Sequence, residues 1–159
     1  MYVDRIEPQF IFRLEATENL VFSHIVGQER GMTVLVNSES EEVKKLFDEL
    51  LHTPKRSFPR SGQPLDAPPK PGVYIIRKEE VVLHVGRTLR GKDGLHQRLK
   101  DHLYGSSSFT KKYLKSKRAI LREGEYTYQF LELEDPRKRA LLEAYAVGVL
   151  CPAHIGLGE

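Results

Sequence analysis

The chain has 159 residues, 40% of them hydrophobic, and a single cysteine, which suffices for one domain with its own core and excludes an internal disulfide framework. Its net charge of +3 is unevenly distributed, since residues 1–69 carry 8 basic and 11 acidic side chains and residues 70–159 carry 17 and 11. No apolar run reaches transmembrane length and no N-terminal run is typical of a signal peptide, so we expect a cytoplasmic protein with no membrane partner.

Residues 1–52 predict a β/α extension. Residues 41–52 repeat apolar side chains at helical spacing. Short strands are expected at residues 8–16, 20–26 and 32–36. No catalytic constellation occurs here, and the segment could extend a sheet, read DNA or form a protein interface.

A proline-rich segment, residues 53–71, follows the extension and holds six of the nine prolines in the chain. Proline fixes φ and removes a backbone donor, so we expect an extended linker. The linker separates the extension from a second domain at residues 72–159.

Two glycine-bearing strands and a polar turn organise this second domain. Apolar and β-branched side chains alternate through residues 72–86 with a break at residues 77–80, which predicts an antiparallel hairpin. The hairpin would bring Tyr74 and His84 close together. A glycine near each of them would allow another backbone, or a phosphate, to approach.

A short helix is predicted at residues 94–104, where Asp93 can serve as its cap. Arg98 and His102 lie four positions apart and therefore share a face beside its leucine stripe. Two groups that can be cationic at the border of a core need an acidic or phosphate partner. A structural salt bridge and a functional phosphate contact would both satisfy them.

A strongly basic stretch surrounds that helix. Residues 86–122 hold 11 basic and 2 acidic side chains, an excess that favours a polyanionic partner such as nucleic acid, although a solvated surface would have the same composition. Residues 105–122 begin as a serine-rich loop and continue as a helix with an outward basic face. The residues expected to contact nucleic acid are Arg87, Thr88, Lys92, Lys111, Lys112 and Lys115.

The last elements are a third strand at residues 126–133 and a helix that Pro136 opens, with Asp135 as its cap. Glu143 is the only charged residue between positions 140 and 150 of this helix. A buried carboxylate is costly unless it is paired or holds a metal. We therefore expect Glu143 to be a metal ligand or the partner of an arginine such as Arg98.

These motifs together resemble the GIY-YIG nuclease superfamily. The triplets Gly72-Val73-Tyr74 and His84-Val85-Gly86, with Thr88 two positions later, are similar to its paired signature, except that histidine replaces the tyrosine of the second triplet. The resemblance covers about residues 70–156 and continues through Arg98, His102 and Glu143. It implies an α+β fold with a small three-stranded antiparallel sheet flanked by helices.

The resemblance also implies a metal-dependent DNA endonuclease that hydrolyses phosphodiester bonds in double-stranded or branched DNA. Glu143 would bind a single Mg²⁺ ion, with Mn²⁺ as an alternative, because Mg²⁺ needs only one or two carboxylates beside water and phosphate oxygens. Arg98 would contact the scissile phosphate. Tyr74 and His84 would orient and deprotonate water, with His102 assisting.

Two other classes of function stay open. His84 departs from the family, and His154 stands nearest to the place of an asparagine often found after the last helix, so the domain could be a degenerate nucleic-acid-binding module. Alternatively, residues 1–69 could be the interface to a protein partner, or to a second copy in a homo-oligomer, with nuclease activity only in the complex. A transition-metal site of His84, His102 and His154 is disfavoured, since no pair has the spacing of a zinc motif.

Overall fold

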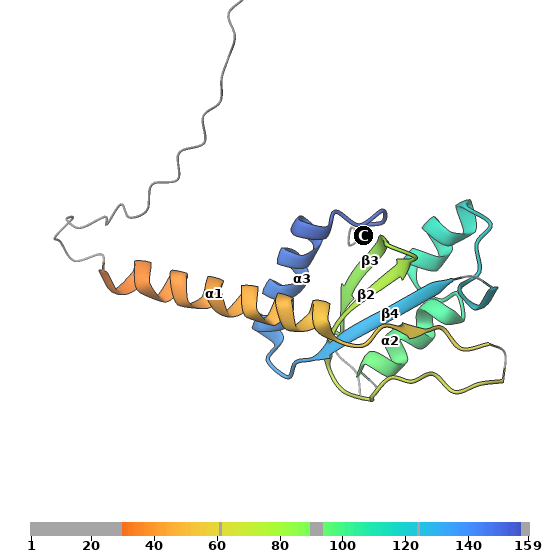
Figure 1. Cartoon of the computed structure of the whole chain (residues 1–159), viewed down its shortest axis with the longest axis horizontal. Coiled ribbons are helices and arrows are strands. Elements are labelled where there is room, and N and C mark those ends of the chain that lie inside the picture. The colour runs from red at the N-terminus through yellow and green to blue at the C-terminus, as the bar shows by residue number, and fades with distance from the viewer. Residues whose placement is uncertain (1–29, 61, 90–93, 124, 157–159) are drawn as a thin grey trace, which may run out of the picture.

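The computed structural model describes residues 30–60, 62–89, 94–123 and 125–156. The strands expected at residues 8–16 and 20–26 and the cap expected at Asp93 lie outside these residues. Figure 1 shows the elements, which in chain order are α1 (Arg30–His52), β1 (Arg56–Ser57), β2 (Gly72–Lys78), β3 (Val81–Arg87), α2 (Gly94–Leu103), the π-helical turn η1 (Phe109–Leu114), the 3₁₀ turn η2 (Leu121–Glu123), β4 (Tyr126–Glu132) and α3 (Pro136–Leu150).

The sheet is antiparallel throughout, with its strands in the order β1-β4-β2-β3. The predicted hairpin forms β2 and β3, and its register places Tyr74 opposite Gly86 and Ile76 opposite His84. The predicted α+β class is confirmed, but the sheet has four strands rather than three. The additional strand, Arg56–Ser57, comes from the predicted linker and pairs with β4. Two residues are too few to show a strand period, so only the tertiary pairing reveals this strand.

The proline-rich segment is extended, as predicted, but it packs along the domain. Phe58 is buried in the core on one face of the sheet. The Tyr128 hydroxyl donates to the backbone oxygen of Asp66 at 3.0 Å, and the backbone N–H of Leu95 donates to the oxygen of Lys70 at 2.7 Å. These bonds hold the segment against β4 and the start of α2.

The alternation of side chains in the hairpin gives the sheet two apolar faces. One face, which includes Tyr74 and Ile76, packs against α2 and η1. The other face, which includes Val73 and Ile75, packs against α1 and α3. Figure 1 shows the sheet between these two layers. Because both faces of β2 are covered, its first five residues are all buried.

Helix α1 begins at Arg30, so residues 32–36, predicted as a strand, are helical instead. A lone strand needs a neighbouring strand for its hydrogen bonds, whereas a helix that has formed over residues 41–52 extends with one internal bond per added residue. Phe47 and Leu50 anchor α1 in the core. Neither α1 nor any other helix in the described part of the chain is long and apolar enough to cross a membrane.

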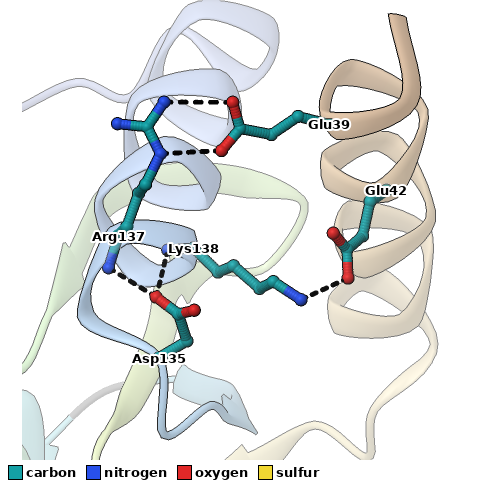
Figure 2. Close-up of polar contacts among 5 residues, drawn as sticks. All are labelled: Glu39, Glu42, Asp135, Arg137 and Lys138. Atoms are coloured by element: carbon teal, nitrogen blue, oxygen red, sulfur yellow. Dashed lines mark hydrogen bonds and ion pairs between the residues drawn. The ribbon is translucent and has the colours of Figure 1, made fainter. Parts of the chain in front are cut away.

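Charged side chains join α1 to the start of α3, as Figure 2 shows. Arg137 donates from Nε and Nη2 to the Glu39 carboxylate at 2.7 and 3.0 Å, and Lys138 pairs with Glu42. Asp135 caps α3, as predicted, by accepting the backbone N–H groups of Arg137 and Lys138 at 2.8 and 3.1 Å. Because such exposed pairs contribute little free energy, they orient α1 more than they stabilise it.

Candidate active site

Thr88, the residue just after the hairpin, ties the end of the second glycine triplet to the start of the first by hydrogen bonds to Gly72. The Gly72 N–H donates to the Thr88 hydroxyl oxygen at 3.0 Å, and the Thr88 N–H donates to the Gly72 carbonyl at 3.0 Å. Thr88 is buried, so its side chain closes the hairpin rather than facing a ligand. A methyl group at Gly86 would lie 2.3 Å from the Tyr74 hydroxyl oxygen, which is why the second triplet ends in glycine.

Behind the hairpin, a buried hydrogen-bond network extends from Tyr74 into the loop after α2. The Tyr74 hydroxyl lies 2.6 Å from His102 Nε2, and His102 Nδ1 lies 2.7 Å from Ser107 Oγ. Ser107 Oγ lies 3.0 Å from Thr110 Oγ1, which donates to the His102 carbonyl at 2.7 Å. If His102 carries its proton on Nδ1, every hydroxyl and ring N–H in this network has an acceptor. The proton of Tyr74 then points at His102 Nε2.

Burial sets the protonation of these groups. It raises the pKa of Tyr74, against an opposing effect of the Arg98 charge. Burial lowers the pKa of His102 well below its usual value, and the charges of His84 and Arg98 lower it further. Burial likewise lowers the pKa of His84 to about 4. At neutral pH the site therefore contains a protonated phenol and neutral imidazoles that can accept protons.

A stack of aromatic rings fixes His84. Its ring lies parallel to Phe109, with centroids 5.0 Å apart and an interplanar angle of 11°. His84 Nδ1 lies 3.3 Å from the carbonyl oxygen of His154, whose backbone N–H donates to Leu83 at 2.9 Å. A proton on Nδ1 would satisfy that carbonyl and leave Nε2 of His84 as the accepting nitrogen. His154 thus holds the imidazole in place from the end of the chain.

An open cleft of about 720 Å³ lies over these residues. Its charged side chains come from β3, α2, η1 and α3, and they are Arg87, Arg98, Lys112 and Glu143. His84 also lines it. The Nε atom of Arg98 is buried and has no hydrogen-bond partner among the described residues. A buried guanidinium N–H without an acceptor is costly, and the excess of cationic side chains around the cleft suits an anionic ligand.

Among the described residues that line the cleft, Glu143 is the only carboxylate, and Arg87 Nε donates to its Oε2 atom at 2.6 Å. The pair is partly exposed, with 28% and 29% of the two side chains accessible. No group of three or more His, Cys, Asp and Glu side chains that could hold a metal occurs in the part of the chain that the structure describes. The donor set therefore fits Mg²⁺, which accepts a single carboxylate and completes its shell with water and phosphate oxygens, rather than zinc.

The structure brings together most of the site residues that the sequence predicts. His84, Arg87, Arg98, Lys112 and Glu143 line the cleft. Tyr74 and His102 lie behind it, and His154 contacts His84. Lys111 and Lys115 line a separate groove, and Lys92 lies outside the described residues.

Sequence reasoning missed Ser107 and Thr110. Ser107 is buried against His102, whereas Ser106 before it is exposed and Ser108 after it lines the cleft. Three consecutive serines carry no signal that would distinguish these roles. A run of hydroxyl residues just after the helix that contains His102 is the only available clue.

The chain was compared with known proteins. No protein-family model matches it, and no curated protein matches it. Solved structures of the GIY-YIG N-terminal endonuclease domain of UvrC from Thermotoga maritima are similar to it. A point mutant bound to its catalytic divalent cation is 22% identical, with a TM-score of 0.43, over 58% of this chain and 90% of that one. The magnesium-bound domain is also 22% identical, with a TM-score of 0.42, over 56% and 86%.

These values restrict the similarity to the fold. The antiparallel hairpin that joins the two triplets and the helices on both faces of the sheet belong to this chain's own structure. The described domain has an α+β fold built on a four-stranded antiparallel sheet.

Proposed function

We propose that this chain is a divalent-cation-dependent endonuclease that hydrolyses phosphodiester bonds of DNA in the cleft over β3. The observation that carries this proposal is the cleft itself, in which the cationic side chains Arg87, Arg98 and Lys112 surround Glu143, the one carboxylate among its described lining residues. A phosphate diester would be the acceptor for these cations, and Glu143 would supply the one protein ligand that Mg²⁺ needs.

The substrate is bound through its phosphates. Arg87, Arg98 and Lys112 place three cationic side chains around one acidic side chain in the cleft. Arg98 is held in α2, whose Leu95 and Leu99 side chains are fully buried, so its guanidinium is positioned before the substrate arrives. Such preorganised charge stabilises the extra negative charge that develops on phosphorus during hydrolysis.

His84 is the residue that accepts a proton from the attacking water. It lines the cleft, whereas Tyr74 is completely buried behind Gly86 and has a raised pKa. Tyr74 and His102 therefore support the site, and the neutral His102 can take the Tyr74 proton if the phenol receives one from the cleft. A divalent cation bound at Glu143 would lower the pKa of the attacking water and neutralise phosphate charge.

The degenerate alternative is favoured by one observation, which is that Arg87 already occupies Oε2 of Glu143. A carboxylate fixed in an ion pair would leave a basic cleft that binds nucleic acid without cutting it. Binding without cleavage in both Mg²⁺ and Mn²⁺ would identify that module.

The test is cleavage of supercoiled plasmid, branched DNA and single strands in Mg²⁺, Mn²⁺ and EDTA, together with DNA binding in EDTA. Glu143→Gln and Arg98→Ala should abolish Mg²⁺-dependent nicking, and Glu143→Gln should still bind DNA. Glu49→Gln, an exposed carboxylate on α1, is the matched control and should cut normally. Intact cleavage by both cleft variants would refute the proposal.

A further inference from the structure

A second groove, of about 610 Å³, includes Thr110 and Lys111 of η1 and is separate from the cleft that Lys112 lines. It is lined by Gly105, Thr110, Lys111, Lys115, Arg118, Ala119 and Ile120. None of these residues lines the candidate active site. Because Lys112 belongs to the cleft and its neighbour Lys111 to the groove, η1 is the wall between the two surfaces.

The groove is positively charged. Lys111, Lys115 and Arg118 are exposed, and none of them forms a salt bridge within the described ranges. No carboxylate lines the groove. Three cations in one concave surface without local counter-charges attract phosphates, and they do so without reading sequence.

An exposed aromatic residue precedes this groove in the chain. Tyr104 directly follows α2 and is bonded to the groove residue Gly105, and 66% of Tyr104 is accessible. Gly105, with a φ of +84°, reverses the chain there, and the Ser106 N–H returns to the Asp101 carbonyl at 2.9 Å, which fixes the backbone of Tyr104. Lys100 Nζ and the Arg122 guanidinium lie 6.0 and 4.8 Å from its ring centre.

Ile120, which lines the groove, is also 52% accessible. The surface therefore combines an aromatic ring, an aliphatic side chain and a row of cations. Exposed aromatic rings beside cations are how proteins hold single strands, because unpaired bases stack on the ring while phosphates follow the charges. A duplex keeps its bases stacked on one another and offers no free face to Tyr104.

We propose that the groove formed by Lys111, Lys115, Arg118 and Ile120, together with the exposed Tyr104 next to Gly105, is a binding site for single-stranded nucleic acid. The site goes beyond the proposed hydrolysis and does not depend on it. Since η1 is shared with the cleft, a substrate with an unpaired arm next to the cleavage point can occupy both surfaces at once.

The test is the fluorescence anisotropy of a labelled oligo(dT) strand of about 20 nucleotides and of a duplex of equal length, both in EDTA. Tyr104→Ala should weaken binding of the strand by about tenfold, because one stacking contact is lost, and leave binding of the duplex unchanged. Tyr104→Phe should bind the strand normally. The double variant Lys111→Ala and Lys115→Ala should reduce the slope of log K against log salt concentration for strand binding by about 1.4. The double variant Lys44→Ala and Lys45→Ala on α1 is the charge-matched control.

The proposal would be overturned if Tyr104→Ala bound the strand normally, or if that variant lost strand and duplex binding equally. It would also be overturned if polyglutamate competed as effectively as unlabelled oligo(dT), because that result would indicate an acidic protein partner. Plasmid nicking, measured for the wild type and for Tyr104→Ala, separates this proposal from the proposed hydrolysis. If strand binding depends on Tyr104 but the protein never nicks DNA, the hydrolytic function is refuted and the single-strand site is not.

Discussion

Arg87 Nε and Glu143 Oε2 lie 2.6 Å apart, so a neighbouring guanidinium already binds the one carboxylate among the described residues of the cleft. The pair joins the end of β3 to the middle of α3. A divalent cation at Glu143 would compete with Arg87 for this oxygen, and the arginine would therefore weaken metal binding while the substrate is absent.

The first prediction follows from this competition. Arg87→Gln should bind Mn²⁺ about fivefold more tightly, because a partly exposed pair is worth about 1 kcal/mol or less. Isothermal titration with Mn²⁺ in the absence of DNA measures the effect directly. Lys70→Gln, which breaks the exposed pair with Glu132, is the control and should leave Mn²⁺ affinity unchanged. Equal Mn²⁺ affinity in Arg87→Gln and the wild type would show that the two do not compete.

The second prediction concerns Gly86, which packs directly against Tyr74. Gly86→Ala should destabilise the fold by about 1–3 kcal/mol in urea unfolding, because its methyl group would overlap the Tyr74 hydroxyl. Tyr74→Phe removes the obstructing oxygen and should restore part of that stability in the double variant. Gly148→Ala in α3 has open space around it and should stabilise the fold by about 0.5–1 kcal/mol. Equal effects at the two glycines would contradict the packing described here.

The third prediction is a dependence of stability on pH. Burial lowers the pKa of His84 to about 4, below the unfolded value of 6.5, so between these values the unfolded chain binds more protons than the folded one. The free energy of unfolding should have its full value above pH 6.5. Protonation of His84 should lower it by roughly 1.4 kcal/mol per pH unit as the pH drops toward 4, and His102 should lower it further. Urea unfolding at pH 7.5, 6 and 5 tests this slope. His84→Gln should flatten it, while His52→Gln, at an exposed position, should not.

The fourth prediction concerns the network behind the cleft. Ser107→Ala removes the acceptor of His102 Nδ1 and should lower kcat for plasmid nicking about tenfold, with DNA binding in EDTA unchanged. A purely structural role would reduce stability without changing the pH profile of kcat. Ser107→Thr keeps the hydroxyl and should recover activity, and Ser116→Ala on the exposed surface is the control.

Regular local patterns made much of this fold predictable from the sequence. The alternation around Tyr74 and His84 predicted the hairpin, and Asp135 followed by Pro136 predicted the start of α3. Strand β1 was not predictable, since its two residues are extended only because β4 lies beside them. The prediction of a strand at residues 32–36 was wrong because β-branched side chains favour strands when the helix that follows them is not considered.

The sequence predicted the position of some candidate residues better than their partners. The helical spacing of Arg98 and His102 predicted that both lie on one face beside the leucine stripe, and the structure places His102 against Tyr74 and Arg98 in the lining of the cleft. The sequence offered Arg98 as the partner of Glu143, but the residue in contact is Arg87, which is 56 positions away along the chain. Such a pairing depends on how α3 lies on β3, and that angle has no local signature.

The packing of α1 against β4 has a practical consequence for the choice of fragments of this protein. The side-chain nitrogen of Gln129 on the central strand β4 donates to the Leu50 carbonyl at 2.6 Å, and Leu50 itself is fully buried. A fragment cut at the start of the first glycine triplet would uncover this amide together with the apolar cluster of Val73 and Ile75 on the sheet and Leu142 on α3. A piece designed to fold alone should therefore include α1 from about Glu39 onward, because the sheet, α3 and α1 share one interior.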